Sequence, residues 1–318
     1  VASFDIELLS DFEGASQMEK RDVTEGKGKG LSEDDRWMRN IWSLPNLAVV
    51  MSYFCVGFAM RFLTTPMSYY MVQMAGAEPA QQNVVLTLAQ LPWSFKLVFG
   101  FISDNFPIGG MRRKPYFIIG WAVYVAVNLM IATSQEPSVQ LLAGGRFVST
   151  VGFMISDVTT DAILVERSKH EPRERRGSMQ AIGYSTRFVG SVLGSVLGMI
   201  LYNKEKWGWG LSIQGCFLLN GVFPFFVIGP WVWQLRETQV VHEVGVVVTD
   251  RLVAQSLEVF GALEQKAVYG PMAVVFIYNL LQVPNAAWTS FLVKGLSFEP
   301  VKIGILGVIA SIMAAVGL

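Results

Sequence analysis

The sequence is poor in charged side chains and in the residues that carry most catalytic chemistry. Only 16% of its 318 residues are charged, the net charge is zero, and there are two cysteines and two histidines. Cys55 and Cys216 both lie inside apolar runs, where a packed thiol is more common than a disulfide or a metal ligand. His170 and His242 lie in the polar stretches between such runs, so we predict no metal site.

Catalytic and nucleic-acid-binding patterns are also missing. We find no phosphate-binding glycine loop, no zinc-ligand helix and no nucleophile elbow in the sequence. The basic residues are not concentrated in one long segment, so nothing indicates a nucleic-acid partner. We therefore predict that the protein is not an enzyme and requires no cofactor.

Long apolar runs are the main feature that is present. Apolar residues make up 52% of the chain and the mean hydropathy is +0.41. A helix needs about 20 residues to cross the hydrocarbon core of a bilayer. Runs of this length lie near residues 45–72, 83–103, 115–134, 140–164, 178–202, 209–234 and 267–293, and an eighth starts near 301. The predicted fold class is an all-α polytopic membrane protein whose spans contact the lipid bilayer.

Lysine and arginine fall unevenly between these predicted spans. One set of loops holds Arg112–Lys114 and five basic residues between Arg167 and Arg176, whereas the alternate loops hold only Lys204, Lys206, Lys294 and Lys302. Basic residues accumulate on the cytosolic side of membrane proteins, so we predict a cytosolic N-terminus. The identity of the membrane, plasma membrane or plastid, stays open, and so does the oligomeric state.

Spacing divides the chain into four predicted regions. Residues 1–44 are polar and are expected to form a disordered cytosolic tail. Residues 45–234 form a bundle of six membrane helices, 235–266 a cytosolic central linker, and 267–318 the first spans of a second bundle. Two bundles joined by a long linker are typical of secondary transporters. Because the sequence begins at a valine and stops inside an apolar run, we expect it to be a fragment.

Six ionisable side chains lie inside the apolar runs: Arg61, Lys96, Arg146, Asp157, Asp161 and Arg187. A charge at the centre of a membrane helix costs about 2.5–3.5 kcal/mol on insertion scales. Such a residue therefore usually faces the protein interior or a water-filled path. This pattern indicates a transporter.

The two aspartates predict a proton-coupling site. Asp157 and Asp161 are four residues apart, so they lie on one helix face. Two carboxylates this close repel each other when both are ionised, which suits a proton carrier, and Asp157 is the deeper of the two. The alternative is that they pair with Arg146, Arg187 or Arg61 as a static clasp of the bundle.

The embedded cations predict a site for an anionic substrate. Arg61, Lys96 and Arg187 lie at similar depths and can bind carboxylates, the guanidinium groups in a bidentate manner. Four embedded cations against two aspartates leave two cations without a partner, which favours an anionic ligand. Arg146 lies near the outer end of its span and is expected to snorkel to the surface.

The loop after the second predicted span indicates a gate. Gly100 and Asp104 are followed by the basic cluster Arg112–Lys114, and this arrangement resembles the signature loop of the major facilitator superfamily. Asp104 can accept hydrogen bonds from Arg112 or Arg113 in one state and lose them in another. The alternative is an ordinary basic inner loop.

Three separated segments together resemble the folate-biopterin transporter family. They are residues 91–116, residues 156–180 with Asp157, Asp161 and Glu166, and residues 278–304 with Pro284 and Glu299. The resemblance covers about residues 45–318. It implies a major facilitator fold of about twelve spans and the uptake of folates or pterins, generally as a proton symporter. A carrier of another small polar solute such as S-adenosylmethionine, or a non-transporting receptor or channel, remains an alternative.

Overall fold

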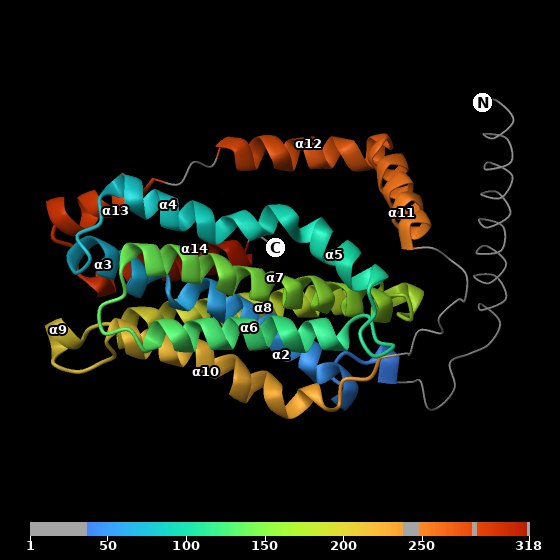
Figure 1. Cartoon of the computed structure of the whole chain (residues 1–318), viewed down its shortest axis with the longest axis horizontal. Helices are drawn as coiled ribbons and strands as arrows, with labels where there is room; N and C mark the ends of the chain where they lie inside the picture. Colours follow the sequence, from blue (N-terminus) through green and yellow to red (C-terminus); the bar gives the residue numbers. More distant parts are fainter. Residues whose placement is uncertain (1–36, 238–247, 282–284, 317–318) are drawn as a thin grey trace, which may run out of the picture.

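The protein is an elongated bundle of long helices in the computed structural model, which describes residues 37–237, 248–281 and 285–316 (Figure 1). Six helical segments of the described chain are long and apolar enough to cross a membrane. They are built from α2 (Leu44–Phe62) with α3 (Thr64–Gln73), α4 (Pro79–Gln90) with α5 (Lys96–Asn105), α6 (Lys114–Ala132), α7 (Val139–Ser168), α8 (Ser178–Leu201) and α10 (Ile213–Val232). The first six predicted spans are confirmed as such helices.

The segments outside this bundle are shorter. They are α9 (Lys204–Trp207), α11 (Val248–Leu263), α12 (Lys266–Leu281), α13 (Ala286–Ser290) and α14 (Pro300–Val316). The seventh predicted span, 267–293, is divided between α12 and α13. The side chain of Asn285 accepts a hydrogen bond from the Trp288 amide at 3.2 Å, and this N-cap starts a new helix inside the apolar run. The eighth predicted helix begins at Pro300.

The polar regions predicted at the N-terminus and in the centre are described only in part. Residues 1–36 of the predicted tail and 238–247 of the predicted linker lie outside the described residues. The end of the tail contacts the bundle, because the Arg167 guanidinium lies 4.4 Å from the centre of the Trp37 ring. Helix α11 occupies most of the remaining linker.

Helix α2 lies at the centre of the bundle and packs closely on α8. Gly190, Gly194 and Gly198 of α8 face the backbone of α2, with no room for a Cβ atom at any of them. Gly57 of α2 faces the Arg187 carbonyl in the same way. Small residues at four-residue spacing allow two membrane helices to approach closely. The glycine ridge therefore fixes Arg187 of α8 against the central helix.

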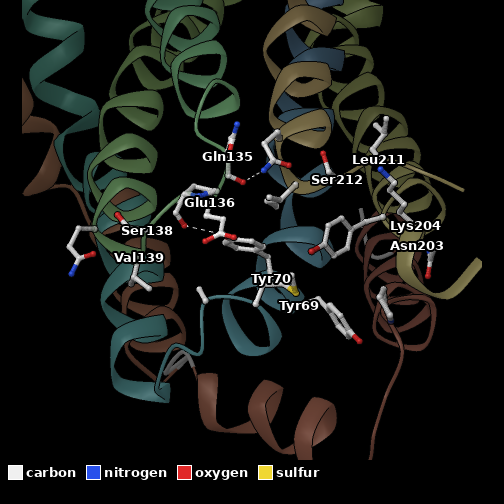
Figure 2. Close-up of a pocket in the computed structure, with 18 residues that line it drawn as sticks. Tyr69, Tyr70, Gln135, Glu136, Ser138, Val139, Asn203, Lys204, Leu211 and Ser212 are labelled. Atoms are coloured by element: carbon white, nitrogen blue, oxygen red, sulfur yellow. Dashed lines mark hydrogen bonds between the residues drawn. The ribbon is translucent and has the colours of Figure 1, made fainter. Parts of the chain in front are cut away.

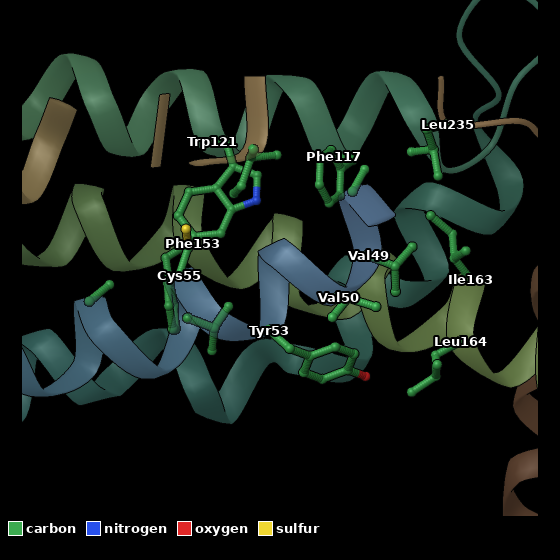
Figure 3. Packing of buried hydrophobic residues seen from close by; sticks show 14 of the residues in the cluster. Val49, Val50, Tyr53, Cys55, Phe117, Trp121, Phe153, Ile163, Leu164 and Leu235 are labelled. Atoms are coloured by element: carbon green, nitrogen blue, oxygen red, sulfur yellow. The ribbon is translucent and has the colours of Figure 1, made fainter. Parts of the chain in front are cut away.

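A buried apolar cluster joins α2 to α6 and α7 (Figure 3). Tyr53 and Cys55 of α2 pack with Trp121 of α6 and Phe153 of α7, all of which are fully or almost fully buried. The Trp121 ring also makes an edge-to-face contact with Tyr124 at 5.6 Å. Close packing of these large rings holds the three helices in one rotation about their axes, which decides where their polar side chains point.

Helix α14 packs on the outer face of α8. The Ser195 and Ser311 hydroxyls lie 3.0 Å apart in a buried hydrogen bond between the two helices. Gly304 of α14 lies directly against the side chain of Met199. The chain that follows the predicted linker thus returns to the six-helix bundle.

Candidate functional site

Four of the embedded charges meet in one ion-pair cluster. Lys96 Nζ lies 2.9 Å from Asp157 Oδ2 and 2.6 Å from Asp161 Oδ2, and Arg187 Nη2 binds Asp157 Oδ1. The Tyr53 hydroxyl donates a hydrogen bond of 2.5 Å to Asp161 Oδ1. We call these five residues, from α2, α5, α7 and α8, the aspartate cluster.

Burial differs strongly within the aspartate cluster. The Asp157 side chain has no exposed surface, whereas 25% of the Asp161 side chain and 36% of the Lys96 side chain are exposed. Two carboxylates are balanced by two cations, as a buried ionic group requires. Asp157 is therefore held by two cations in the dry interior, and Asp161 lies at the edge that water reaches.

Local sequence explains why these groups meet. Asp157 and Asp161 share one face of α7 because they are four residues apart. Lys96 is the first residue of α5 and follows a short 3₁₀ segment, Leu91–Phe95, that contains Pro92. A 3₁₀ segment has three residues per turn, so it changes the direction in which the following helix presents its side chains.

A cavity of about 460 Å³ contains the other two embedded cations. Arg61 and Arg146 both line it, together with the aromatic residues Trp93, Tyr124 and Phe153. Among the residues that the structure describes, neither arginine has a carboxylate within ion-pair distance. We call this space the arginine cavity.

The arginine cavity adjoins the aspartate cluster. Arg146, Thr150, Phe153, Asp157 and Asp161 follow each other at intervals of three or four residues, so they lie along one face of α7. The Trp93 and Phe153 ring centres are 5.9 Å apart, and Lys96 Nζ lies 6.0 Å from the Trp93 ring. This face of α7 thus carries Arg146 toward one end and the balanced cluster toward the other, and Arg61 of α2 lines the same cavity as Arg146.

The three predicted substrate-binding cations are therefore divided between two places. Arg61 lines the cavity, whereas Lys96 and Arg187 are bound to aspartates. Arg146, which we expected to snorkel, lies in the cavity beside the Tyr124 hydroxyl instead. Of the three arginines considered as partners of the aspartates, Arg187 is bound to Asp157, whereas Arg61 and Arg146 have no carboxylate partner among the described residues.

A buried polar network next to Arg146 was not predicted from the sequence. Asn220 Nδ2 donates hydrogen bonds to the Tyr124 hydroxyl at 2.5 Å and to Asn128 Oδ1 at 2.9 Å. Asn128 Nδ2 donates to the Ser149 hydroxyl at 2.9 Å. The sequence signal was an asparagine inside each of two apolar helices, α6 and α10. This network fixes the Tyr124 hydroxyl against which Arg146 lies.

The predicted gating residues lie together at the end of the bundle that carries the basic loops. Arg113 Nη2 is 2.5 Å from Asp104 Oδ1, and Arg113 Nε is 3.3 Å from Glu166 Oε1. Arg112 contributes its backbone N–H, which donates to Glu237 Oε1 at 2.7 Å. The Glu237 carboxylate also accepts the next two amides and so caps the start of α6. The gating role itself stays a prediction.

Glu171 caps the start of α8 at the same end. Its carboxylate accepts hydrogen bonds from the Ser178 hydroxyl and from the amides of Gly177 and Met179, at 2.6–2.8 Å. Partial burial opposes ionisation, but these three donors outweigh it and hold the pKa of Glu171 below its usual value. The sequence analysis did not identify this cap.

A second hollow, of about 590 Å³, lies at the opposite end of the bundle (Figure 2). Tyr69 and Tyr70 of α3 line it together with the α6–α7 loop, where the Tyr70 hydroxyl donates to the Pro137 carbonyl at 3.2 Å. Glu136 and Lys204 also line this hollow. Across the described ranges, no three His, Cys, Asp or Glu side chains are grouped so that they could hold a metal ion.

Comparison with known proteins identifies the family. The model of the BT1 family matches residues 56–318. The chain is 31% identical over 195 residues to "Probable folate-biopterin transporter 4" of Arabidopsis thaliana, covering 59% of this chain and 38% of that protein. It is 24% identical over 283 residues to the "Folate-biopterin transporter" of Synechocystis, covering 87% and 53%. The "Folate transporter 1" of Plasmodium falciparum is 26% identical over 151 residues, covering 46% and 30%.

The chain spans about half, or less, of the length of the curated relatives that it matches. The resemblance to folate-biopterin transporters noted from the sequence is confirmed. The chain belongs to the BT1 family, which is a family of transporters and not of enzymes.

Proposed function

We propose that the protein is a secondary active transporter that moves a folate or a pterin across a membrane by alternating access. One observation carries the proposal: two arginines without a carboxylate partner in the described chain line a cavity beside a balanced ion-pair cluster. Unpaired cations inside a membrane protein are costly unless they face water or a ligand. The printed names of the relatives supply the solute class.

The aspartate cluster suits proton coupling. Asp157 is bound to both Lys96 and Arg187, so its protonation would remove the partner of Arg187 and one of the two partners of Lys96. Arg187 would then be free to bind an anionic solute in the adjoining cavity, and Lys96 would keep only Asp161 as a competing carboxylate. We therefore assign the coupling proton to Asp157, with Asp161 as its neighbour on the water-accessible edge. This assignment gives Lys96 and Arg187 a substrate-binding role in the protonated state only.

Gating would occur at the end that carries the basic loops, which we place in the cytosol. Arg113 is bound by Asp104 and Glu166 from two different helices, and these contacts would break when that end opens. We propose that α2 to α10 form the first bundle of a major facilitator fold. Helices α12 to α14 would then begin the second bundle, and the two would rock about the arginine cavity.

Uptake measurements test this function. Cells that lack their own folate and pterin uptake are made to express the protein at the surface, and accumulation of labelled folate and biopterin is compared with empty-vector cells. We expect accumulation of at least one solute, and we expect a proton uncoupler to abolish it. Surface expression without uptake of either solute rejects the proposed substrates. Conductance without accumulation would instead indicate a channel.

A further inference from the structure

We propose that Arg61 and Arg146 form a carboxylate-binding subsite, so that the protein prefers a solute that joins a flat heteroaromatic ring to carboxylates over a neutral pteridine. The inference rests on the proposed function and makes it more specific. Of the two proposed solutes, folate has a glutamate tail that carries carboxylates, and we expect the protein to bind it more tightly than biopterin. The subsite lies at the end of the arginine cavity away from the aspartate cluster.

Charge balance is the first argument. Every other embedded ionisable side chain among the described spans has a partner, because Lys96 binds Asp157 and Asp161 and Arg187 binds Asp157. The uncompensated charge is therefore confined to Arg61 and Arg146, and both line the same cavity. A bound dianion would neutralise this surplus. A neutral ligand would leave two desolvated cations behind.

The chemistry of the donors is the second argument. A guanidinium presents its N–H groups in a planar fork that matches a carboxylate and binds it through two hydrogen bonds. One arginine comes from α2 and the other from α7, so they approach the cavity from two helices. Two such forks suit a solute with two carboxylates better than a single anionic group.

Fixed orientation is the third argument. Arg146 lies beside the Tyr124 hydroxyl, which also accepts a hydrogen bond from Asn220 at 2.5 Å. Asn220 is bound in turn to Asn128, and Tyr124, Asn128 and Asn220 are all fully or almost fully buried. A snorkelling arginine needs no such support, because its charged end lies in the polar headgroup region. The network is what a binding side chain requires, since it limits the orientations available to the guanidinium before a ligand arrives.

The remaining walls of the cavity suit a flat ring. Trp93 and Phe153 lie between the arginines and the aspartate cluster, with their ring centres 5.9 Å apart. Gln90 and Thr150 add hydrogen-bonding groups to the same walls. The volume of about 460 Å³ is within the usual range of about 300–1,000 Å³ for small-molecule sites. Arg146 and Phe153, which both line the cavity, are seven residues apart on α7, or about 10 Å along the helix at 1.5 Å per residue. A ring beside Phe153 and a carboxylate at Arg146 can therefore belong to one solute.

Equilibrium binding and uptake of labelled folate and labelled biopterin test the subsite. The variants are Arg61→Gln, Arg146→Gln and Arg146→Lys, and the matched control is Arg175→Gln, an exposed loop arginine. Loss of one arginine should raise the folate Kd and KM about tenfold or more, because a hydrogen bond to a charged group contributes about that factor. Biopterin binding should change less than threefold. Arg146→Lys should lie between the wild type and Arg146→Gln, because the charge remains while the fork is lost.

The possible outcomes separate the subsite from the proposed function. Equal effects on folate and biopterin, or no effect on folate, would overturn the subsite even if both solutes are transported. Binding of folate to the purified full chain that depends on both arginines, without accumulation of either solute by cells, supports the subsite and rejects the transport proposal. Failure of the wild type to bind folate rejects the subsite. Thermal unfolding of each variant, compared with Arg175→Gln, shows whether a loss of binding reflects misfolding.

Discussion

Replacing Asp157 by asparagine should destabilise the bundle more than the same change at Asp161. The Asp157 side chain has no exposed surface and binds both Lys96 and Arg187. Its removal leaves Arg187 without a carboxylate among the described residues, and breaking a buried ion pair on one side costs about 3–5 kcal/mol. At Asp161 the carboxylate and Lys96 are partly exposed, and Lys96 keeps Asp157. We expect a loss of about 1 kcal/mol there.

Unfolding of the purified protein in mixed micelles measures these losses. Detergent titration followed by the loss of helical circular dichroism gives the free energy of unfolding for the wild type and both variants. A loss at Asp157→Asn that is smaller than the loss at Asp161→Asn would refute the reasoning. A control removes the whole pair: Asp157→Leu combined with Arg187→Met should recover most of the stability, because apolar residues of similar volume replace a buried ion pair at little cost.

The same double variant separates the two roles of Asp157. It restores packing without restoring a carboxylate at position 157, whereas Lys96 keeps its contact with Asp161 at 2.6 Å. If Asp157 carries the coupling proton and Arg187 binds the solute once Asp157 is protonated, the double variant should lose uncoupler-sensitive accumulation despite normal stability. Full proton-driven accumulation by the double variant would reduce Asp157 to a static clasp.

Three further changes have defined outcomes. Gly190→Ala should destabilise the protein by about 1–3 kcal/mol, because the added Cβ would meet the backbone of α2. The control is Gly144→Ala, where an added Cβ would have no atom within 4 Å. This control should be tolerated in the same unfolding titration. Glu171→Gln should lower the free energy of unfolding by about 1 kcal/mol at neutral pH. Folding depresses the pKa of Glu171, so the wild type should keep this whole advantage above about pH 4.3, the usual pKa of a glutamate. The advantage should disappear as the pH falls through the lower pKa of the folded state. If the stability difference between the wild type and Glu171→Gln grew as the pH fell, the capping role of Glu171 would be contradicted. Arg113→Gln should make the loop between α5 and α6 more susceptible to proteolysis, because three side-chain contacts are lost; unchanged cleavage would remove Arg113 from the closure of that end.

Much of the fold could be predicted because membrane spans are encoded locally. Six apolar runs of sufficient length became six long helices, and the four-residue spacing of Asp157 and Asp161 correctly predicted one shared face. The division of the seventh span was missed. A hydropathy count cannot see that Asn285 caps a new helix, because one polar residue hardly changes the average over a long window.

The charge count predicted two surplus cations but could not say which two. Partner choice depends on the rotation of α5 after its 3₁₀ segment and on the glycine contact that fixes α8 on α2. Both are tertiary properties. Arg146 was expected at the membrane surface because of its place in the run, whereas the hydroxyl of Tyr124 and the cavity are visible only after folding. The carboxylate caps Glu171 and Glu237 were missed for the same reason, because loop closure brings them to their helices.

Cysteine labelling tests the central claim most directly, which is that the arginine cavity holds water and binds the solute. In a protein whose buried Cys55 and Cys216 are replaced by alanine, Ser68→Cys places a thiol on the cavity wall and Val148→Cys places one on α7 outside it. A charged, membrane-impermeant thiol reagent should label Ser68→Cys and not Val148→Cys, and folate should slow the labelling of Ser68→Cys. A thiol at position 68 that stays unlabelled from both sides of the membrane, with and without folate, would contradict the account.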